Sequence, residues 1–176
     1  MALLAQIGVT PDRIAPHDID ETPQRDEAPR QYAARMAAEK ARAAAEPGAF
    51  VLAADTVVAV GRRILPKAEH ADQARACLDL LSGRRHHVMT AVTLVAPDGK
   101  AASRLSESTV IFVRLTEHQK IAYLAGGEWQ GKAGGYAIQG AAAAYIRALQ
   151  GSYSGVVGLP LFETAQLLRG CGYLRP

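Results

Sequence analysis

One acidic residue lies in an otherwise apolar stretch of the chain. Asp55 sits within VLAADTVVAV, where the residues on both sides are apolar apart from Thr56. A carboxylate buried without a partner costs several kcal/mol, so it needs a metal ion, a cation or a proton. Asp followed by Thr at the end of a hydrophobic strand is also a common place for a ligand site in α/β folds. The alternative is that Asp55 caps a turn, but we favour a functional role.

Two lysines and a glutamine lie in or near glycine-rich or turn segments. Lys132 and Gln139 belong to GKAGGYAIQG, residues 131–140, which contains four glycines. Small neighbours let backbone N–H groups and an ammonium group converge on a phosphate, although the segment lacks the P-loop pattern. Gln139 can donate to and accept from the edge of a base, or it can simply bond the backbone of a turn. Lys67, in ILPKAEH, is a surface lysine unless it lies close to Asp55.

Other charged residues give weaker signals. Lys40 and Glu39 are neighbours in an Ala-rich segment, and such pairs are usually solvated. Glu21 could ligate a metal together with Asp18 or Asp20, or it could be a simple loop acid, which the sequence alone favours.

The whole set of candidates indicates phosphate chemistry. His86 and His87 are adjacent on a predicted strand, so they point to opposite faces and are interpreted as structural. Lysines and carboxylates without a thiolate or histidine cluster suggest a hard cation such as Mg²⁺ and an anionic phosphate substrate. The residues therefore indicate either a phosphate-chemistry enzyme or a nucleotide-binding module.

Composition narrows the class of protein. The chain has 176 residues, a formal charge of +3 and 49% hydrophobic residues, which suits one globular domain. Lys and Arg are scattered, so a nucleic-acid groove is not indicated. The two cysteines favour a reducing compartment, and no apolar run approaches the ~20 residues that span a bilayer. The expectation is a soluble cytoplasmic protein with neither a nucleic-acid nor a membrane partner.

The elements that must position these residues follow from periodicity and turn signals. The predicted helices are a short one closed by Gly8, a long one over 29–46, and others over 70–83, over 116–127 and from about Leu161. The predicted strands are 49–61 and a hairpin of 86–100 with 102–116, whereas 62–70 and the stretch after Gly151 are predicted as turns, and 141–151 could be helix or strand. We expect a single α/β domain over residues 1–176, with a mixed twisted sheet flanked by helices and two lobes around a central cleft.

Several stretches taken together resemble the Maf family of nucleoside triphosphate pyrophosphatases. They occur in the family's order and cover nearly the whole chain. They are DIDETP, the AAEKA helix, LAADTVV, ILPKAEHADQA, LSGRRHHVMTAVTL, EWQGKAGGYAIQGAAAAYI and GSYSGVVGLPLFET. ADT together with KAGGYAIQG is similar to the branch that acts on dTTP and UTP, whereas the branch acting on 7-methyl-GTP typically has SDQ.

The resemblance implies hydrolysis of a nucleoside triphosphate between its α- and β-phosphates. It implies that Asp55 is the general base and that Thr56 and Gln139 set specificity. It assigns phosphate or metal roles to Lys40, Lys67, Lys132 and Glu21, with Glu21 and Asp55 as ligands of Mg²⁺ or Mn²⁺. A homodimer is expected by resemblance only.

One feature departs from the family pattern. Members open with a strand and an SxSPRR loop, whereas this chain begins MALLAQIG, which would follow that loop. The strand and the arginine loop are therefore expected to be missing from the chain as given. Beside the dTTP/UTP pyrophosphatase, two competing functions therefore stay open: a catalytically weak nucleotide-binding or cell-division regulatory protein, which the missing loop would suggest, and a 7-methyl-GTP pyrophosphatase.

Overall fold

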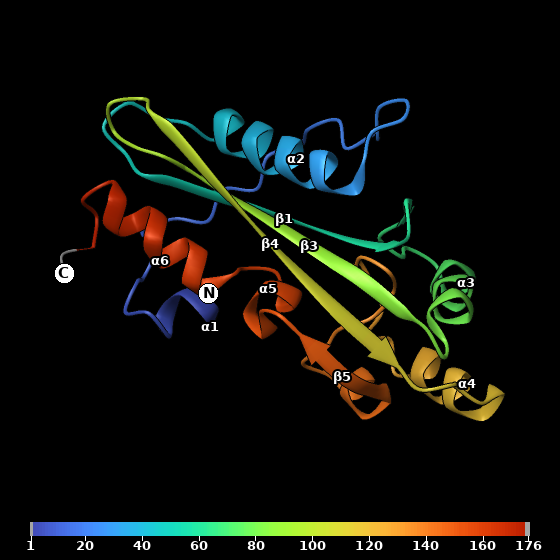
Figure 1. Ribbon diagram of the computed structural model, residues 1–176. Coiled ribbons are helices and arrows are strands. Elements are labelled where there is room, and N and C mark those ends of the chain that lie inside the picture. The colour runs from blue at the N-terminus through green and yellow to red at the C-terminus, as the bar shows by residue number, and fades with distance from the viewer. Residues whose placement is uncertain (1, 175–176) are drawn as a thin grey trace.

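The computed structural model describes residues 2–174 and forms a twisted five-stranded sheet with helices on both faces (Figure 1). The elements in chain order are α1 (Ala2–Ala5), α2 (Pro29–Ala43), β1 (Val51–Val60), β2 (Arg63–Leu65), α3 (Ala71–Leu81), β3 (Arg85–Val95), β4 (Ala101–Phe112), α4 (Glu117–Ala125), the 3₁₀ helix η1 (Ala141–Tyr145), β5 (Ile146–Gln150), α5 (Tyr153–Val157) and α6 (Leu161–Gly170). The α/β class and the helix-flanked sheet are confirmed.

The sheet has the strand order β2-β1-β3-β4-β5, and every pairing between its named strands is antiparallel. The expectation of a mixed sheet was therefore wrong for the described residues. The physical reason is connectivity. β1 and β2, and likewise β3 and β4, are joined by tight turns, which only antiparallel neighbours allow.

Two local predictions need correction. Residues 62–70 were predicted as a turn, but Arg63–Leu65 form β2, which pairs with β1 through a two-residue turn at Gly61, where φ is +60°. Glycine readily supplies this left-handed conformation, so the hairpin signal was present in the sequence. The stretch after Gly151 is also more than a turn, because it contains the short helix α5.

Other predictions agree closely with the structure. The β3–β4 hairpin closes at the predicted PDGK turn, and Thr116 and Gln119 form the predicted capping box of α4. The long helix α2 ends at Ala43, earlier than predicted. The stretch 141–151, which could be helix or strand by its sequence, contains the 3₁₀ helix η1 followed by the strand β5.

The alternation of side chains along the long strands divides the core. Val57, Ala59 and Met89 face α2 and pack with Tyr32 and Met36. The opposite face holds two clusters, one beneath α3 and α4 and one beneath α6. Thr56 and Thr90 are directly opposite each other on β1 and β3, on the strand faces opposite to Val57 and Met89.

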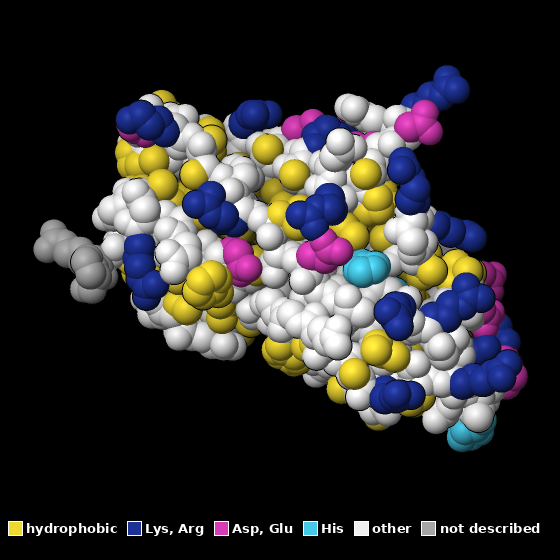
Figure 2. All heavy atoms as spheres, in the orientation of Figure 1, with side chains coloured by type: hydrophobic (Ala, Val, Ile, Leu, Met, Phe, Trp, Pro, Cys, Tyr) yellow, Lys and Arg dark blue, Asp and Glu magenta, His cyan; other side chains and the backbone are white. Residues whose placement is uncertain are grey.

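Two further features of the described residues bear on the class of protein. None of their helices is long and apolar enough to cross a membrane. Lys and Arg side chains are distributed over the face seen in Figure 2 and do not form one continuous band.

Candidate functional site

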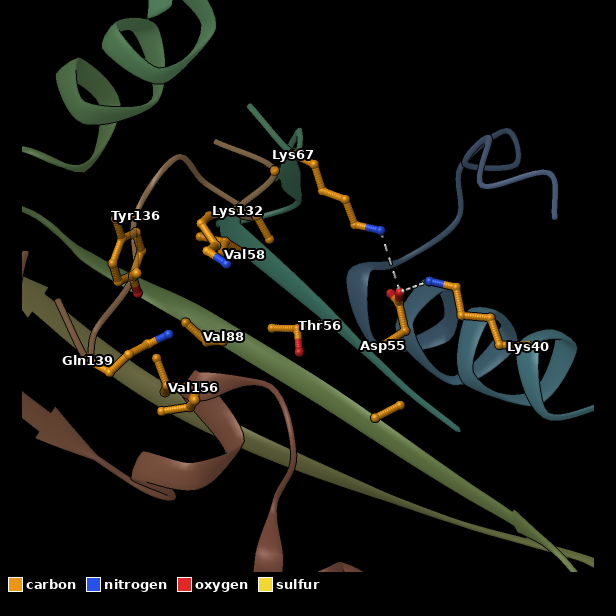
Figure 3. A pocket seen from close by; sticks show the side chains of 15 residues that line it. Lys40, Asp55, Thr56, Val58, Lys67, Val88, Lys132, Tyr136, Gln139 and Val156 are labelled. Carbon is orange, nitrogen blue, oxygen red and sulfur yellow. Dashed lines mark hydrogen bonds and ion pairs between the residues drawn. The ribbon is translucent and has the colours of Figure 1, made fainter. Parts of the chain in front are cut away.

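A pocket of about 240 Å³ lies beside the middle of β1. It is lined by Lys40, Ala54, Asp55, Thr56, Val58, Lys67, Val88, Gly131, Lys132, Ala133, Tyr136, Ala137, Gln139, Val156 and Val157. Six of the seven residues predicted from the sequence are among them, and Glu21 lines an adjoining pocket that shares Asp55 and Thr56. Figure 3 shows how the labelled side chains lie around the first pocket.

The open edge of β1 allows one site to use both faces of the strand. β2 pairs only with Val58–Val60, so β1 has no named strand partner on that side at Asp55 and Thr56 among residues 2–174. Consecutive strand residues point to opposite faces, yet both side chains line the same pocket. The site therefore wraps around the strand edge, with Asp55 on the α2 side and Thr56 on the other.

Asp55 is held by two lysines from different elements. The side chain of Asp55 is only 4% exposed, and its Oδ1 lies 2.6 Å from Lys40 Nζ on α2 and 3.9 Å from Lys67 Nζ (Figure 3). Burial raises the pKa of Asp55 above its ordinary value, although the Lys40 ammonium opposes the rise. A carboxyl group with a raised pKa is a stronger base than one in water, as general-base catalysis near neutral pH requires.

Glu21 completes this cluster of charges. Its two carboxylate oxygens lie 2.6 Å from Lys40 Nζ and 2.5 Å from Lys67 Nζ. Burial favours a higher pKa for Glu21, but the two lysines outweigh it and lower the pKa. In the same way, burial works against the charged form of Lys40, while hydrogen bonds to Asp55 and Glu21 raise its pKa overall.

Two sequence alternatives are resolved by these contacts. Lys40 does not belong to a solvated pair with Glu39, because Lys40 bonds inward and Glu39 pairs instead with Arg35. Asp20 is exposed and accepts a hydrogen bond from the Thr22 backbone N–H at 2.9 Å, so it caps a turn and is not part of the cluster.

The glycine-rich segment 131–140 is both a structural turn and a wall of the pocket. Backbone bonds join Gly131 and Lys132 to Ala68, and Gly134 to Pro66, which brings the segments of Lys132 and Lys67 side by side.

The glycines themselves have packing reasons. Gly134 has φ +68°, and a Cβ placed there would lie 2.8 Å from Val58 Cγ1. Gly135 also has φ +68°, and its Cβ would lie 3.1 Å from Ala74 Cα. Both positions therefore require glycine for conformation and for close approach. These two glycines support the wall, whereas Lys132 and Gln139 face the pocket.

Sequence reasoning missed several pocket residues. Tyr136 lines the pocket, and its hydroxyl bonds His86 Nε2 at 2.8 Å within the core. Val88 and Val156 supply apolar walls. Val88 could have been found, because alternation places it on the same face of β3 as the buried His86 and Thr90. Val156 could not, because its segment was predicted as a turn.

The cluster can hold charge of either sign. The first pocket is lined by three lysines and one carboxylate, so its charged side chains carry a net positive charge when all are ionised, whereas the adjoining pocket adds the carboxylates of Glu21 and Glu69. Such a site can neutralise phosphate oxygens and place a carboxylate base beside them.

Comparison with known proteins agrees with this geometry. Residues 1–171 match the family described as Maf-like protein. The chain is 64% identical over 173 residues to a dTTP/UTP pyrophosphatase of Caulobacter vibrioides, covering 97% of this chain and 90% of that protein. It is 61% identical to a protein of the same name from Rhodospirillum rubrum, covering 97% and 82%, and 58% identical to one from Paramagnetospirillum magneticum, covering 97% and 91%. The match over nearly the whole chain and these identities show that the protein belongs to the Maf family.

Proposed function

We propose that the protein is a nucleoside triphosphate pyrophosphatase that hydrolyses dTTP and UTP to the monophosphate and pyrophosphate. The observation that carries the proposal is the nearly buried Asp55 carboxylate, held by Lys40 at the edge of a pocket that Lys67 and Lys132 also line. The relatives named dTTP/UTP pyrophosphatase support this substrate class.

Asp55 acts as the general base in this mechanism. Its carboxylate accepts a proton from a water molecule as the water oxygen forms a bond to the α-phosphorus. The bond from that phosphorus to the bridging oxygen breaks, and pyrophosphate leaves. The Lys40, Lys67 and Lys132 ammonium groups neutralise charge on the phosphate oxygens.

A divalent ion, Mg²⁺ or Mn²⁺, fits the donor set of the cluster. Among residues 2–174, Asp55 Oδ2 makes no protein hydrogen bond, and the same residues include no group of three or more His, Cys, Asp or Glu that could hold a metal alone. Glu21 and Asp55 would thus supply two carboxylates, and phosphate oxygens and water the remaining ligands, as Mg²⁺ prefers. When bound, the ion would neutralise phosphate charge.

Thr56 and Gln139 set the specificity for the base in this proposal. Figure 3 shows them on opposite sides of the space that Val88 and Val156 line. A flat pyrimidine fits between two polar side chains and apolar walls. Gln139→Ala should narrow the preference for dTTP and UTP over CTP and ATP, because a hydrogen bond contributes about 0.5–1.5 kcal/mol.

A substrate panel tests the proposal. Pyrophosphate release would be measured for dTTP, UTP, CTP, ATP, GTP and 7-methyl-GTP with Mg²⁺, Mn²⁺ and EDTA, with Asp55→Asn as the control. The proposal predicts the fastest release from dTTP and UTP. Fastest release from 7-methyl-GTP would assign the other branch. Nucleotide binding without release from any of them would indicate a regulatory binding protein.

We also propose a cytoplasmic location and a homodimer. Nucleoside triphosphates are cytoplasmic substrates, so an enzyme that consumes them works in that compartment. Light scattering coupled to size-exclusion chromatography would measure the mass of the particle. A mass near the 18.7 kDa of one chain would contradict the dimer.

A further inference from the structure

We propose that Thr90 is a positioning residue that fixes which way the Thr56 hydroxyl points its proton, and thereby makes the pocket select bases with an N3–H donor. The inference rests on the proposed function, because it deepens the specificity of the same site. Thr90 lines neither of the two pockets and is 1% exposed, so it would act only through Thr56.

The hydroxyls form a short chain that starts at the pocket and ends in the core. Thr56 Oγ1 lies 2.9 Å from Thr90 Oγ1, and the two residues are direct cross-strand partners. Thr90 Oγ1 lies 2.7 Å from the backbone carbonyl oxygen of Gly155, at α5. Two strands and a helix therefore meet through one buried side chain.

The polarity of this chain follows from counting protons. A carbonyl oxygen can only accept, so the bond to Gly155 uses the single hydroxyl proton of Thr90. The reverse arrangement, with Thr90 donating to Thr56, would leave two acceptor oxygens 2.7 Å apart with no proton between them. Thr56 must then donate to Thr90, because that arrangement makes both hydrogen bonds and strands neither oxygen.

Thr56 consequently faces a ligand only as an acceptor. Its one proton is directed at Thr90, so only lone pairs remain on the oxygen of a side chain that lines the pocket. Uracil and thymine present an N3–H donor between two carbonyl oxygens, which suits such an acceptor. Cytosine presents a bare N3 lone pair there, which would face the Thr56 lone pair without a proton between them.

Gln139 cannot supply this discrimination alone. An amide side chain carries both a donor and an acceptor and can turn over to suit either base. Thr56 is different, because its hydroxyl orientation is fixed by a residue that no solvent reaches. Thr56 therefore supplies the fixed acceptor, and Gln139 contributes to the specificity by adding its own hydrogen bond to the nucleobase.

The experiment compares Thr90→Val with two matched variants. Thr90→Val keeps the shape and removes the hydroxyl, so the Thr56 proton becomes free to turn towards a ligand. Thr90→Ser keeps the hydroxyl. Thr93 lies on the same strand, and its buried hydroxyl forms a hydrogen bond with Ser103 Oγ at 2.8 Å, but Thr93 lines neither pocket. The Thr93→Val variant therefore controls for the loss of a buried threonine hydroxyl.

The readout is the ratio of kcat/KM for UTP to that for CTP, with unfolding measured alongside. In Thr90→Val the ratio should fall by about tenfold, because the freed Thr56 hydroxyl can donate its proton to N3 of cytosine. Cytosine binding then no longer leaves two lone pairs facing each other. Thr90→Ser should keep the wild-type ratio, and Thr93→Val should keep it even if its Tm falls. A folded Thr90→Val with the wild-type ratio would overturn the proposal, as would a Thr90→Ser that behaves like Thr90→Val.

Failure of the proposed function remains distinguishable. Binding of the α,β-methylene analogues of UTP and CTP, measured by calorimetry, gives the same ratio without turnover. If the wild type releases no pyrophosphate, the pyrophosphatase proposal fails, and the analogue ratio still decides the role of Thr90. If the wild type turns over UTP and CTP equally, the pyrophosphatase activity stands and the role of Thr90 is refuted.

Discussion

Replacing Lys40 with methionine should destabilise the protein in a pH-dependent way and move its activity profile. Lys40 Nζ bonds both Asp55 and Glu21 at 2.6 Å, and its side chain is 22% exposed. Methionine keeps much of the length and apolar surface of the side chain but leaves Asp55 with only Lys67, 3.9 Å away. A nearly buried carboxylate then loses its main partner.

The magnitude follows from the burial of the pair. Removing one partner of a fully buried ion pair costs about 3–5 kcal/mol. Lys40 is partly solvated and Lys67 remains, so we expect the free energy of unfolding to fall by about 2–3 kcal/mol at pH 8.

The sign of the pH dependence follows from the pKa of Asp55. Burial already raises this pKa, and loss of the Lys40 charge raises it further. A group whose folded pKa exceeds its unfolded value contributes stability below the unfolded pKa, about 3.9, and loses it as pH rises through the folded pKa. The penalty of the variant should therefore be full at pH 8 and shrink towards pH 4.

Urea unfolding at pH 8 and pH 4.5 measures the penalty, and a pH profile of kcat/KM measures the base. The acid limb of the profile should move to higher pH, because the base must be ionised to act. Arg42→Met is the matched control, since Arg42 is an exposed residue on the same helix. Equal penalties at both pH values, or an unmoved acid limb, would refute the reasoning about Asp55.

Three further predictions concern other residues. Asp55→Asn should lower kcat by about 10²–10⁴ while nucleotide still binds by calorimetry, and near-normal turnover would remove Asp55 from the mechanism. Lys132→Ala should raise KM or lower kcat with little change in Tm. Gly134→Val should instead lower Tm, because a Cβ at this position would lie 2.8 Å from Val58 Cγ1. Wild-type kinetics in Lys132→Ala would leave only a structural role for the glycine-rich segment 131–140. Burial lowers the pKa of His86 to about 4, so the contribution of neutral His86 to stability is present above pH 6.5 and is lost as pH falls towards 4. Between these two pH values, the Tm of His86→Gln should depend less on pH than that of the wild type. The same change of Tm with pH in both proteins would contradict this.

The sequence predicted the strand that carries Asp55 because the signal is local. Asp55 stands out as an acid in an apolar run, and β1 formed where that run predicted it. Lys40 was ambiguous for a different reason. Its neighbour Glu39 suggested a solvated pair, yet the buried side of α2 holds Ala33, Met36, Ala37 and Ala41. Lys40 lies four residues after Met36, so helical periodicity already placed it beside the buried stripe.

The parts that the sequence could not provide depend on contacts between distant segments. Lys67 joins the site because its segment pairs with 131–134, more than sixty residues later in the chain, and no local pattern encodes that pairing. The polarity of Thr56 is less visible still, since it depends on Thr90 and on a carbonyl oxygen of α5. On the proposal made above, a sequence motif can indicate which residue touches the nucleobase, but the direction of its hydrogen bond is decided by core residues that line neither pocket. This is why exchanging Thr56 alone would be an incomplete test of specificity, and why the buried partner is the more informative residue to change.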